Sequence, residues 1–332
     1  MMRFNSILFN IVEQCNIRCR HCGYADSTRE KECGDDELID WVIQAVDYGF
    51  PQIIFTGGEP FLRFPLLKRG VEAVYLRGGS SGIFTNALWG KTLESARETL
   101  KQLPGLTHLY LSSDVYHLEF VPAQYILNVI AVARELSIPT VVICITYTSE
   151  EDKRDMTALF EGQGDYVNFH YGRVIPSPQV HRLVSDAYSC MHEFVPENFP
   201  SQCFLHTPLV NPNGTLSTCH IGKVETHFEI TESPYYLGNL KEEKLRDIFA
   251  RAEENSAYQL LRVYGPQALV KIALASEAGD RLRDEKFSCE CHMCFMVMRN
   301  PEVVSELQKQ ACLAPVQNNI FLKRVLQLGD KV

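Results

Sequence analysis

Short apolar runs alternate with longer amphipathic stretches through the first half of the chain. The short runs have the length of strands, and the longer stretches repeat apolar residues at helical spacing. The pattern predicts strands at 6–12, 52–56, 82–85, 108–112, 140–147 and 166–170, and helices at 35–48, 65–76, 92–103, 122–136 and from 149 onwards. Strands that alternate with helices in this way indicate a parallel sheet. The predicted fold class is therefore α/β, built from six β–α units.

The alternation ends near Pro176, where several prolines mark an irregular stretch. Beyond it, Asn211–Gly214 predicts a hairpin turn, and Pro301 suits the first position of a last helix. Further helices are expected at 242–253 and 258–278. We therefore expect three parts, which are 1–175, 176–300 and 301–332.

The composition is that of a globular protein, with 45% hydrophobic and 22% charged residues among 332. The net charge of −9 argues against a non-specific nucleic-acid binder, which needs a basic surface. No apolar run reaches the length of a membrane span, and polar residues interrupt the N-terminal apolar patch, which argues against a signal peptide. The 12 cysteines are therefore expected to be reduced thiols in a cytoplasmic protein, and their short spacings favour metal binding over disulfides.

Residue types that carry chemistry follow directly after the predicted strands. In parallel barrels and sheets, the functional site lies at the carboxyl ends of the strands. The segments at these ends are Cys15–Cys22, Gly57–Pro60, Thr85–Asn86, Ser112–Asp114 and Gly172–Arg173. Their placement predicts a site at that edge of the sheet.

Three cysteines, Cys15, Cys19 and Cys22, lie close together after the first strand. Thiolate is the usual ligand of iron–sulfur clusters, and three thiolates would hold three irons of a [4Fe–4S] cube and leave the fourth iron open. An open position is what a metal site keeps when it must bind a reacting group. A zinc site in which His21 is the fourth ligand is the alternative.

The segment Gly57–Pro60, with the sequence Gly-Gly-Glu-Pro, follows the second strand. Its two glycines would let a ligand approach the backbone closely. Its carbonyl groups and the Glu59 carboxylate are suited to accept hydrogen bonds from an ammonium group. Taken alone, the segment is equally compatible with a tight turn.

With both motifs in place, the sequence resembles the radical S-adenosylmethionine (SAM) superfamily. The resemblance rests on the CxxxCxxC set Cys15, Cys19 and Cys22 and on Gly57–Pro60, and it covers about residues 4–175. It implies a partial (β/α)6 TIM-like barrel, a [4Fe–4S] cluster on the three cysteines, and SAM chelated to the fourth iron. Reductive cleavage of SAM would give a 5′-deoxyadenosyl radical that abstracts hydrogen from a substrate. The implied partner is an electron donor such as a flavodoxin or a ferredoxin.

The resemblance also implies further SAM contacts. Gly57, Gly58 and Glu59 would meet the methionine amino group, and Arg173 would pair with the SAM carboxylate. His21 takes a position that is often aromatic in the family, near the adenine. The other residues of the implied cofactor site are Pro60, Thr85, Asn86, Ser112 and Ser113. For each contact, an ordinary loop residue is the alternative.

Asp114, Tyr116 and His117 follow the fourth strand and are the candidates for contact with the substrate. Their side chains are suited to hydrogen bonding or proton transfer, whereas a surface loop is the structural alternative. Cys190 and Cys33 are candidate thiols for returning a hydrogen atom to a substrate radical.

A second group of cysteines lies in the C-terminal half, where Cys203 and Cys219 are followed far downstream by Cys291 and Cys294. This spacing resembles the SPASM/twitch extension of radical SAM enzymes over about residues 200–300. The resemblance implies one auxiliary [4Fe–4S] cluster on these four cysteines, since the further cysteines of the two-cluster form are missing after Cys294. Cys289 remains open as a replacement for Cys291, and a structural zinc site is the alternative.

The sequence therefore predicts a radical SAM enzyme that acts as an oxidoreductase, lyase or isomerase. Because Cys15 leaves no room for a preceding peptide-binding domain, a small natural-product intermediate is favoured, such as a sugar or aminocyclitol that is oxidised, dehydrated or epimerised. A peptide-modifying maturase or epimerase is the alternative substrate class. A non-catalytic iron–sulfur or zinc protein with a redox or regulatory role is the alternative from another class, and cleavage of SAM distinguishes it.

Overall fold

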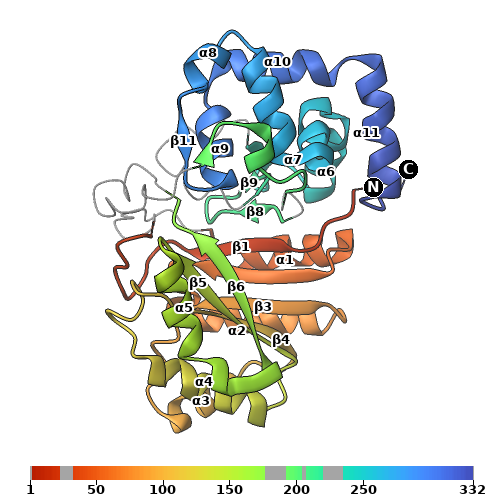
Figure 1. Cartoon of the computed structure of the whole chain (residues 1–332). Coiled ribbons are helices and arrows are strands. Elements are labelled where there is room, and N and C mark those ends of the chain that lie inside the picture. Colours follow the sequence, from red (N-terminus) through yellow and green to blue (C-terminus); the bar gives the residue numbers. More distant parts are fainter. Residues whose placement is uncertain (1, 23–32, 176–191, 204–206, 220–234, 332) are drawn as a thin grey trace. The chain divides into compact units, whose positions relative to one another are not determined.

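The structure is a computed structural model that describes residues 2–22, 33–175, 192–203, 207–219 and 235–331 (Figure 1). The chain divides into two compact units. The sheet unit comprises Ser6–Ala187 and Val210–Asn213, and the helical unit comprises Met1–Asn5, Tyr188–Leu209 and Gly214–Val332.

Six parallel strands form the centre of the sheet unit and lie side by side in chain order. They are β1 (Ile7–Val12), β2 (Gln52–Gly57), β3 (Ser80–Thr85), β4 (Leu106–Ser112), β5 (Thr140–Tyr147) and β6 (Val167–Arg173). The connections carry α1 (Asp35–Tyr48), η1 (Pro60–Arg63), α2 (Phe64–Tyr75), α3 (Leu93–Leu100), α4 (Ala123–Glu135), α5 (Glu150–Ala158) and η2 (Glu161–Tyr166) (Figure 1). The predicted α/β class with β–α units is confirmed, and the strand order is that of a partial (β/α)6 barrel.

Local signals define several helix ends where the sequence predicts them. The Ser149 hydroxyl accepts the backbone N–H of Asp152, which forms a capping box at the predicted start of α5. At the end of α1, Gly49 adopts a left-handed conformation with φ of 98°. A residue with a Cβ would be strained there, which explains why the helix ends at a glycine.

The fifth strand differs from its prediction in one respect. Its nearly continuous apolar sequence predicts burial on both faces, but only alternate residues from Val141 to Tyr147 are buried. The residues between them, from Thr140 to Thr146, are half-buried. One face of β5 therefore packs in the core while the other remains partly accessible, as expected for the inner face of an open barrel. Gly172 and Arg173, expected just after the sixth strand, are its last two residues.

The helical unit consists mainly of short helices with small antiparallel strand pairs. Its helices are α6 (Leu245–Glu254), α7 (Ser256–Ala275), α8 (Gly279–Leu282), α9 (Glu290–Val297), α10 (Pro301–Ala311) and α11 (Ala314–Leu326). Strand β7 (His192–Glu193) pairs with β11 (Lys286–Phe287), and β9 (Thr215–Ser217) pairs with β10 (Tyr236–Asn239). The remaining short elements are η4 (Pro196–Asn198) and β8 (Leu209–Val210), of which Val210 belongs to the sheet unit.

A proline interrupts the helix predicted at 258–278, and the C-terminal part forms two helices. Within α7, Gly265 has φ of 61° and precedes Pro266, so the helix is kinked at that point. The last helix begins at Pro301 with an Asn300 cap, as predicted, but it ends at Ala311. A separate helix, α11, then begins with a proline in its first turn. Within the described part of the chain, no helix combines the length and apolarity that crossing a membrane requires.

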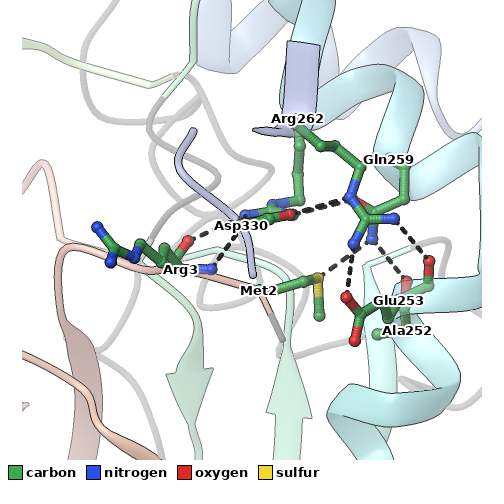
Figure 2. A network of polar contacts seen from close by, with 8 residues as sticks. Met2, Arg3, Ala252, Glu253, Gln259, Arg262 and Asp330 are labelled. Atoms are coloured by element: carbon green, nitrogen blue, oxygen red, sulfur yellow. Dashed lines mark hydrogen bonds and ion pairs between the residues drawn. The ribbon is translucent and has the colours of Figure 1, made fainter. Parts of the chain in front are cut away.

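A buried polar network joins the two ends of the chain within the helical unit (Figure 2). The Arg262 guanidinium on α7 pairs with the Asp330 carboxylate at 3.0 Å, and both side chains are fully buried. Asp330 also accepts the backbone N–H of Arg3 at 2.7 Å and the Nε–H of Arg324 at 2.9 Å. Gln259 donates to the backbone carbonyl of Ala252, and its amide lies 3.1 Å from the Met2 sulfur. This network fixes both chain termini to α6 and α7.

Candidate functional site

The three-cysteine loop leaves the carboxyl end of β1 and is held there by the segment that follows β2. The backbone N–H of Gly58 donates to the Val12 carbonyl at 2.7 Å, and the N–H of Glu59 donates to the Gln14 carbonyl at 2.9 Å. These two bonds fix the residues immediately before Cys15. The cysteine loop and the segment after β2, which were predicted to meet at this edge of the sheet, therefore lie side by side.

The two glycines after β2 are needed for this close packing. A Cβ at Gly57 would lie 2.2 Å from the Val12 carbonyl oxygen, and a Cβ at Gly58 would lie 2.1 Å from that of Gln14. Gly57 also has φ of 152°, in a region that side chains with a Cβ rarely adopt. The sequence predicts that these glycines admit a ligand, whereas the backbone that approaches them is that of the chain itself.

Glu59 lies fully buried at the centre of this arrangement. Its carboxylate accepts the backbone N–H of Phe61 at 3.1 Å, the Thr85 hydroxyl at 2.9 Å and the backbone N–H of Asn86 at 2.8 Å. Burial raises the pKa of Glu59 to about 7, although these three donors favour the charged form. Pro60 follows as the first residue of the 3₁₀ turn that Glu59 caps.

The end of β3 connects Glu59 to the cysteine loop. The Asn86 side-chain amide donates to the Asn16 side-chain oxygen at 2.8 Å and lies 3.7 Å from the Cys15 sulfur. The Trp89 indole donates to the Thr85 hydroxyl at 3.0 Å. Thr85 and Asn86, both predicted as site residues, therefore contact Glu59 directly, and Asn86 also contacts the loop.

The three thiols of the loop suit an iron–sulfur cluster. Burial raises the pKa of Cys15 to about 11 and raises that of Cys19 further, and each thiol also feels the charge of Cys22. Thiols in such a place become thiolates only if a cation compensates their charge, which iron provides. A zinc ion would supply such a cation as well, so the prediction of an iron–sulfur cluster rests on the spacing of the motif.

A polar cluster at the carboxyl end of β4 lies next to the loop. The Asp114 carboxylate is buried and accepts the backbone N–H groups of Tyr116 and His117 at 3.1 and 3.0 Å. His117 Nδ1 lies 2.9 Å and His21 Nε2 3.8 Å from the other carboxylate oxygen. Among the described residues, these are the three side chains whose possible metal-ligand atoms all lie within 4.8 Å of one another.

Electrostatics within this cluster favour a charged Asp114 and a neutral His21. Burial alone would raise the pKa of Asp114, but His117 and His21 hold it below its ordinary value. Burial lowers the pKa of His21 to about 4, against the opposing charge of Asp114. The His21 ring lies 4.7 Å from that of Tyr116 and 5.3 Å from that of His117. His21 thus links the cysteine loop to the predicted substrate residues.

The other predicted cofactor residues are less closely joined to the loop. Ser113 is fully buried, and its backbone N–H donates to the Cys144 carbonyl at 3.0 Å. Ser112 is the last residue of β4. Arg173 pairs with Glu150 at 3.1 Å, and its guanidinium lies 5.0 Å from the Tyr147 ring centre.

The second cysteine group lies within the helical unit. The pKa of Cys291 is raised first by the Cys289 thiol and by burial, and further by the charges of Cys203 and Cys219. Cys291 and Cys294 lie three residues apart on α9, which places them on the same side of the helix. The Cys289 sulfur instead accepts the backbone N–H of His292 at 3.4 Å and caps α9.

Sequence reasoning missed several residues that support these sites. Asn16 receives the Asn86 amide, Trp89 holds Thr85, and the Tyr235 hydroxyl donates to the Cys294 sulfur at 3.3 Å. The position of Asn16 next to a predicted ligand, Cys15, was an available signal, whereas Tyr235 is separated from Cys294 by 59 residues. Cys190, predicted as a hydrogen donor, lies outside the described residues.

Comparisons with known proteins agree with the geometry of the sheet unit. Residues 9–161 match the model of the radical SAM superfamily. A putative peptide biosynthesis protein, YydG of Bacillus subtilis strain 168, is 26% identical over 166 residues, which are 49% of this chain and 51% of that protein. GTP 3′,8-cyclase of Listeria welshimeri is 32% identical over 117 residues, which are 33% of this chain and 34% of the cyclase.

Solved structures of similar fold include SuiB of Streptococcus suis bound to S-adenosylmethionine, with 12% sequence identity and a TM-score of 0.46. That match covers 75% of this chain and 66% of SuiB. This chain spans about half the length of YydG and about a third of the cyclase.

Proposed function

Because the chain belongs to the radical SAM superfamily of enzymes through residues 9–161, we propose that it binds a [4Fe–4S] cluster on Cys15, Cys19 and Cys22 and cleaves SAM there. When bound, the cluster and SAM together supply a 5′-deoxyadenosyl radical for hydrogen abstraction. The observation that carries this proposal is the backbone clamp of Gly58 and Glu59 on the residues before Cys15. The clamp brings the two family motifs into one site.

The strand ends around the loop supply the groups that would hold SAM. The backbone of Gly57 to Glu59 would meet the methionine amino group, because the Glu59 carboxylate is already occupied by three donors of the chain. His21 would lie near the adenine, and Arg173 would pair with the SAM carboxylate by exchanging its bond to Glu150. The remaining proposed contacts are Pro60, Thr85, Asn86, Ser112 and Ser113.

In the helical unit, an auxiliary [4Fe–4S] cluster would be held by Cys203, Cys219, Cys291 and Cys294. The charge coupling of Cys291 to Cys203 and Cys219, which lie 88 and 72 residues before it in the sequence, supports this set. Cys289 is the other candidate ligand in place of Cys291, since its thiol has the largest effect on Cys291. Such a cluster is able to accept the electron that a substrate radical leaves behind.

The substrate would be a small polar molecule that reacts beside Asp114, Tyr116 and His117. Asp114 accepts the His117 backbone N–H, and its carboxylate lies 2.9 Å from the ring Nδ1. An imidazole beside a carboxylate is suited to take the proton of a substrate hydroxyl when the adjoining carbon has lost hydrogen. Oxidation, dehydration or epimerisation of a natural-product intermediate fits these groups.

Modification of a peptide is the second candidate function. The observation that favours it is the similarity to the putative peptide biosynthesis protein over 49% of this chain. A peptide substrate would use the same cluster and the same residues after β4. The two candidates therefore differ in what is bound, and the radical chemistry is common to both.

The test is anaerobic reconstitution with iron and sulfide, followed by reduction and addition of SAM. We expect methionine and 5′-deoxyadenosine from the wild-type protein, and none from Cys19→Ala. Cys33→Ala is the matched control, because Cys33 is also buried but lies outside the motif. Bound zinc, or bound iron without SAM cleavage, would refute the proposal and favour the non-catalytic alternative.

A further inference from the structure

Asn86 is the residue through which the Glu59 carboxylate and the cysteine loop are connected. It is buried, and its backbone N–H donates to Glu59 at 2.8 Å. Its side-chain amide donates to Asn16 at 2.8 Å and lies 3.7 Å from the Cys15 sulfur. One residue therefore contacts both a proposed cluster ligand and the acidic residue beside it.

The orientation of the Asn86 amide is set by its own loop. Its side-chain oxygen accepts the backbone N–H of Leu88 at 2.9 Å. Exchanging the amide nitrogen and oxygen would break this bond and would also place two oxygens against each other at Asn16. The NH₂ group is therefore the end that faces Cys15.

An N–H group that faces a cluster sulfur affects the two oxidation states unequally. The reduced cluster carries one more negative charge, and the positive end of the N–H dipole stabilises it more than the oxidised form. Hydrogen bonds to the sulfurs are among the features that set the potentials of iron–sulfur clusters. The negative charge of the Glu59 carboxylate acts in the opposite direction. Asn86 donates to both groups.

We propose that Asn86 is a positioning residue that directs an N–H group at the Cys15 sulfur and thereby raises the reduction potential of the cluster that cleaves SAM. This inference rests on the proposed function, since it needs a cluster on Cys15. It assigns Asn86 a role toward the cluster ligand in addition to any contact with SAM.

The same geometry predicts an opposite effect at Asn16. Its side-chain oxygen takes the nearer hydrogen bond from Asn86 and also lies 3.9 Å from the Cys15 sulfur. Without that oxygen, the Asn86 amide is free to donate to Cys15 alone. Removal of Asn16 should therefore raise the potential, whereas removal of Asn86 should lower it. General loosening of the loop would not give shifts of opposite sign.

The experiment is a redox titration of the reconstituted full-length protein, followed by electron paramagnetic resonance. The signal to follow is the one that changes when SAM is added, which separates this cluster from any auxiliary one. A net hydrogen-bond difference of about 0.5–1.5 kcal/mol corresponds to a roughly two- to tenfold change in the reduction equilibrium. A tenfold change is 59 mV for a one-electron couple.

We expect Asn86→Ala to lower the potential by up to this amount and Asn16→Ala to raise it. Trp89→Phe is the control, because it breaks a bond to Thr85 in the same network without contacting Cys15, and it should leave the potential unchanged. An unchanged potential in Asn86→Ala, or equal shifts in all three variants, overturns the inference. If Asn86→Ala fails to retain iron, Asn16→Ala decides the question: a raised potential supports the inference, and a lowered or unchanged potential overturns it.

The two levels of proposal fail separately. A wild-type protein that binds no cluster or cleaves no SAM refutes the proposed function. A wild-type protein that cleaves SAM, together with variants whose potentials do not move, refutes the role of Asn86 alone.

Discussion

Removing the charge of Asp330 should destabilise the helical unit strongly. Its carboxylate is fully buried against the equally buried Arg262, and it also receives hydrogen bonds from Arg3 and Arg324 (Figure 2). Burial alone would raise the pKa of Asp330, but Arg262 and the other two donors hold it below its ordinary value. In Asp330→Asn, the Arg262 guanidinium keeps its charge and loses the anion that compensates it.

The expected magnitude follows from the burial of both partners. Breaking a buried ion pair by removing one partner costs about 3–5 kcal/mol, because an uncompensated charge remains inside the protein. Whole domains are stable by about 5–15 kcal/mol, so this loss is a large part of what holds the unit together. Since the pair joins α7 to the C-terminal segment, the loss should appear first as opening of that helix.

Hydrogen exchange with mass spectrometry measures this opening without assuming that a chain of two units unfolds in one step. Peptides from α7 are compared between wild type and Asp330→Asn. A change of about 3–5 kcal/mol corresponds to exchange that is roughly 10²- to 10⁴-fold faster. Peptides from β1 to β6 should show little change.

Two further variants test the electrostatic explanation. Glu302→Gln breaks an exposed pair with Arg281 in the same unit and should change exchange less than tenfold, since surface pairs contribute about 0–1 kcal/mol. Replacing both buried partners, as Arg262→Met with Asp330→Leu, should restore much of the protection, because no charge is left unpaired. Exchange in Asp330→Asn that stays within tenfold of wild type would refute the reasoning.

Three other predictions concern the site itself. Burial raises the pKa of Glu59 to about 7 from an ordinary 4.5. The contribution of Glu59 to the stability of the fold is therefore greatest below pH 4.5, and about 3 kcal/mol of it is lost as the pH rises through 7. Glu59→Gln should flatten this pH dependence in thermal unfolding between pH 5 and 8. Gly57→Ala should destabilise the sheet unit by about 1–3 kcal/mol and lower iron retention after reconstitution, whereas Gly162→Ala, which meets no neighbour, should do neither. Iron analysis should show that Cys291→Ala loses the auxiliary cluster and that Cys289→Ala retains it; the reverse pattern would assign the ligand to Cys289.

The elements of the sheet unit were predictable because their signals are local. The capping box from Ser149 to Asp152 and the glycine after α1 each act within one turn of a helix, so the sequence contains the whole cause. The kink in α7 had such a signal as well, in the adjacent Gly265 and Pro266, but the surrounding apolar residues suggested one continuous helix. That prediction gave more weight to the helical spacing of the apolar residues than to the helix-breaking pair Gly265 and Pro266.

Contacts between distant residues were not predictable in the same way. Arg262 and Asp330 are 68 residues apart, and nothing near either residue indicates that both are buried. The two glycines after β2 were predicted as site residues, but the reason differs, because the backbone at Val12 and Gln14 approaches them. A sequence motif shows which position needs a glycine more readily than it shows which neighbouring segment leaves no room for a side chain there.

The placement of the cysteine loop shows how such a site is built. The motif Cys15–Cys22 contains the proposed ligands. Its start is held by backbone bonds from the segment after β2, and Cys15 lies against the Asn86 amide at the end of β3. Both of these segments meet at the Glu59 carboxylate. Because successive parallel strands end at the same edge, three loops that are distant in sequence share one buried acid. The position of the proposed ligands therefore depends on the register of β1, β2 and β3, and a change in this shared contact should affect iron binding even when every cysteine is intact.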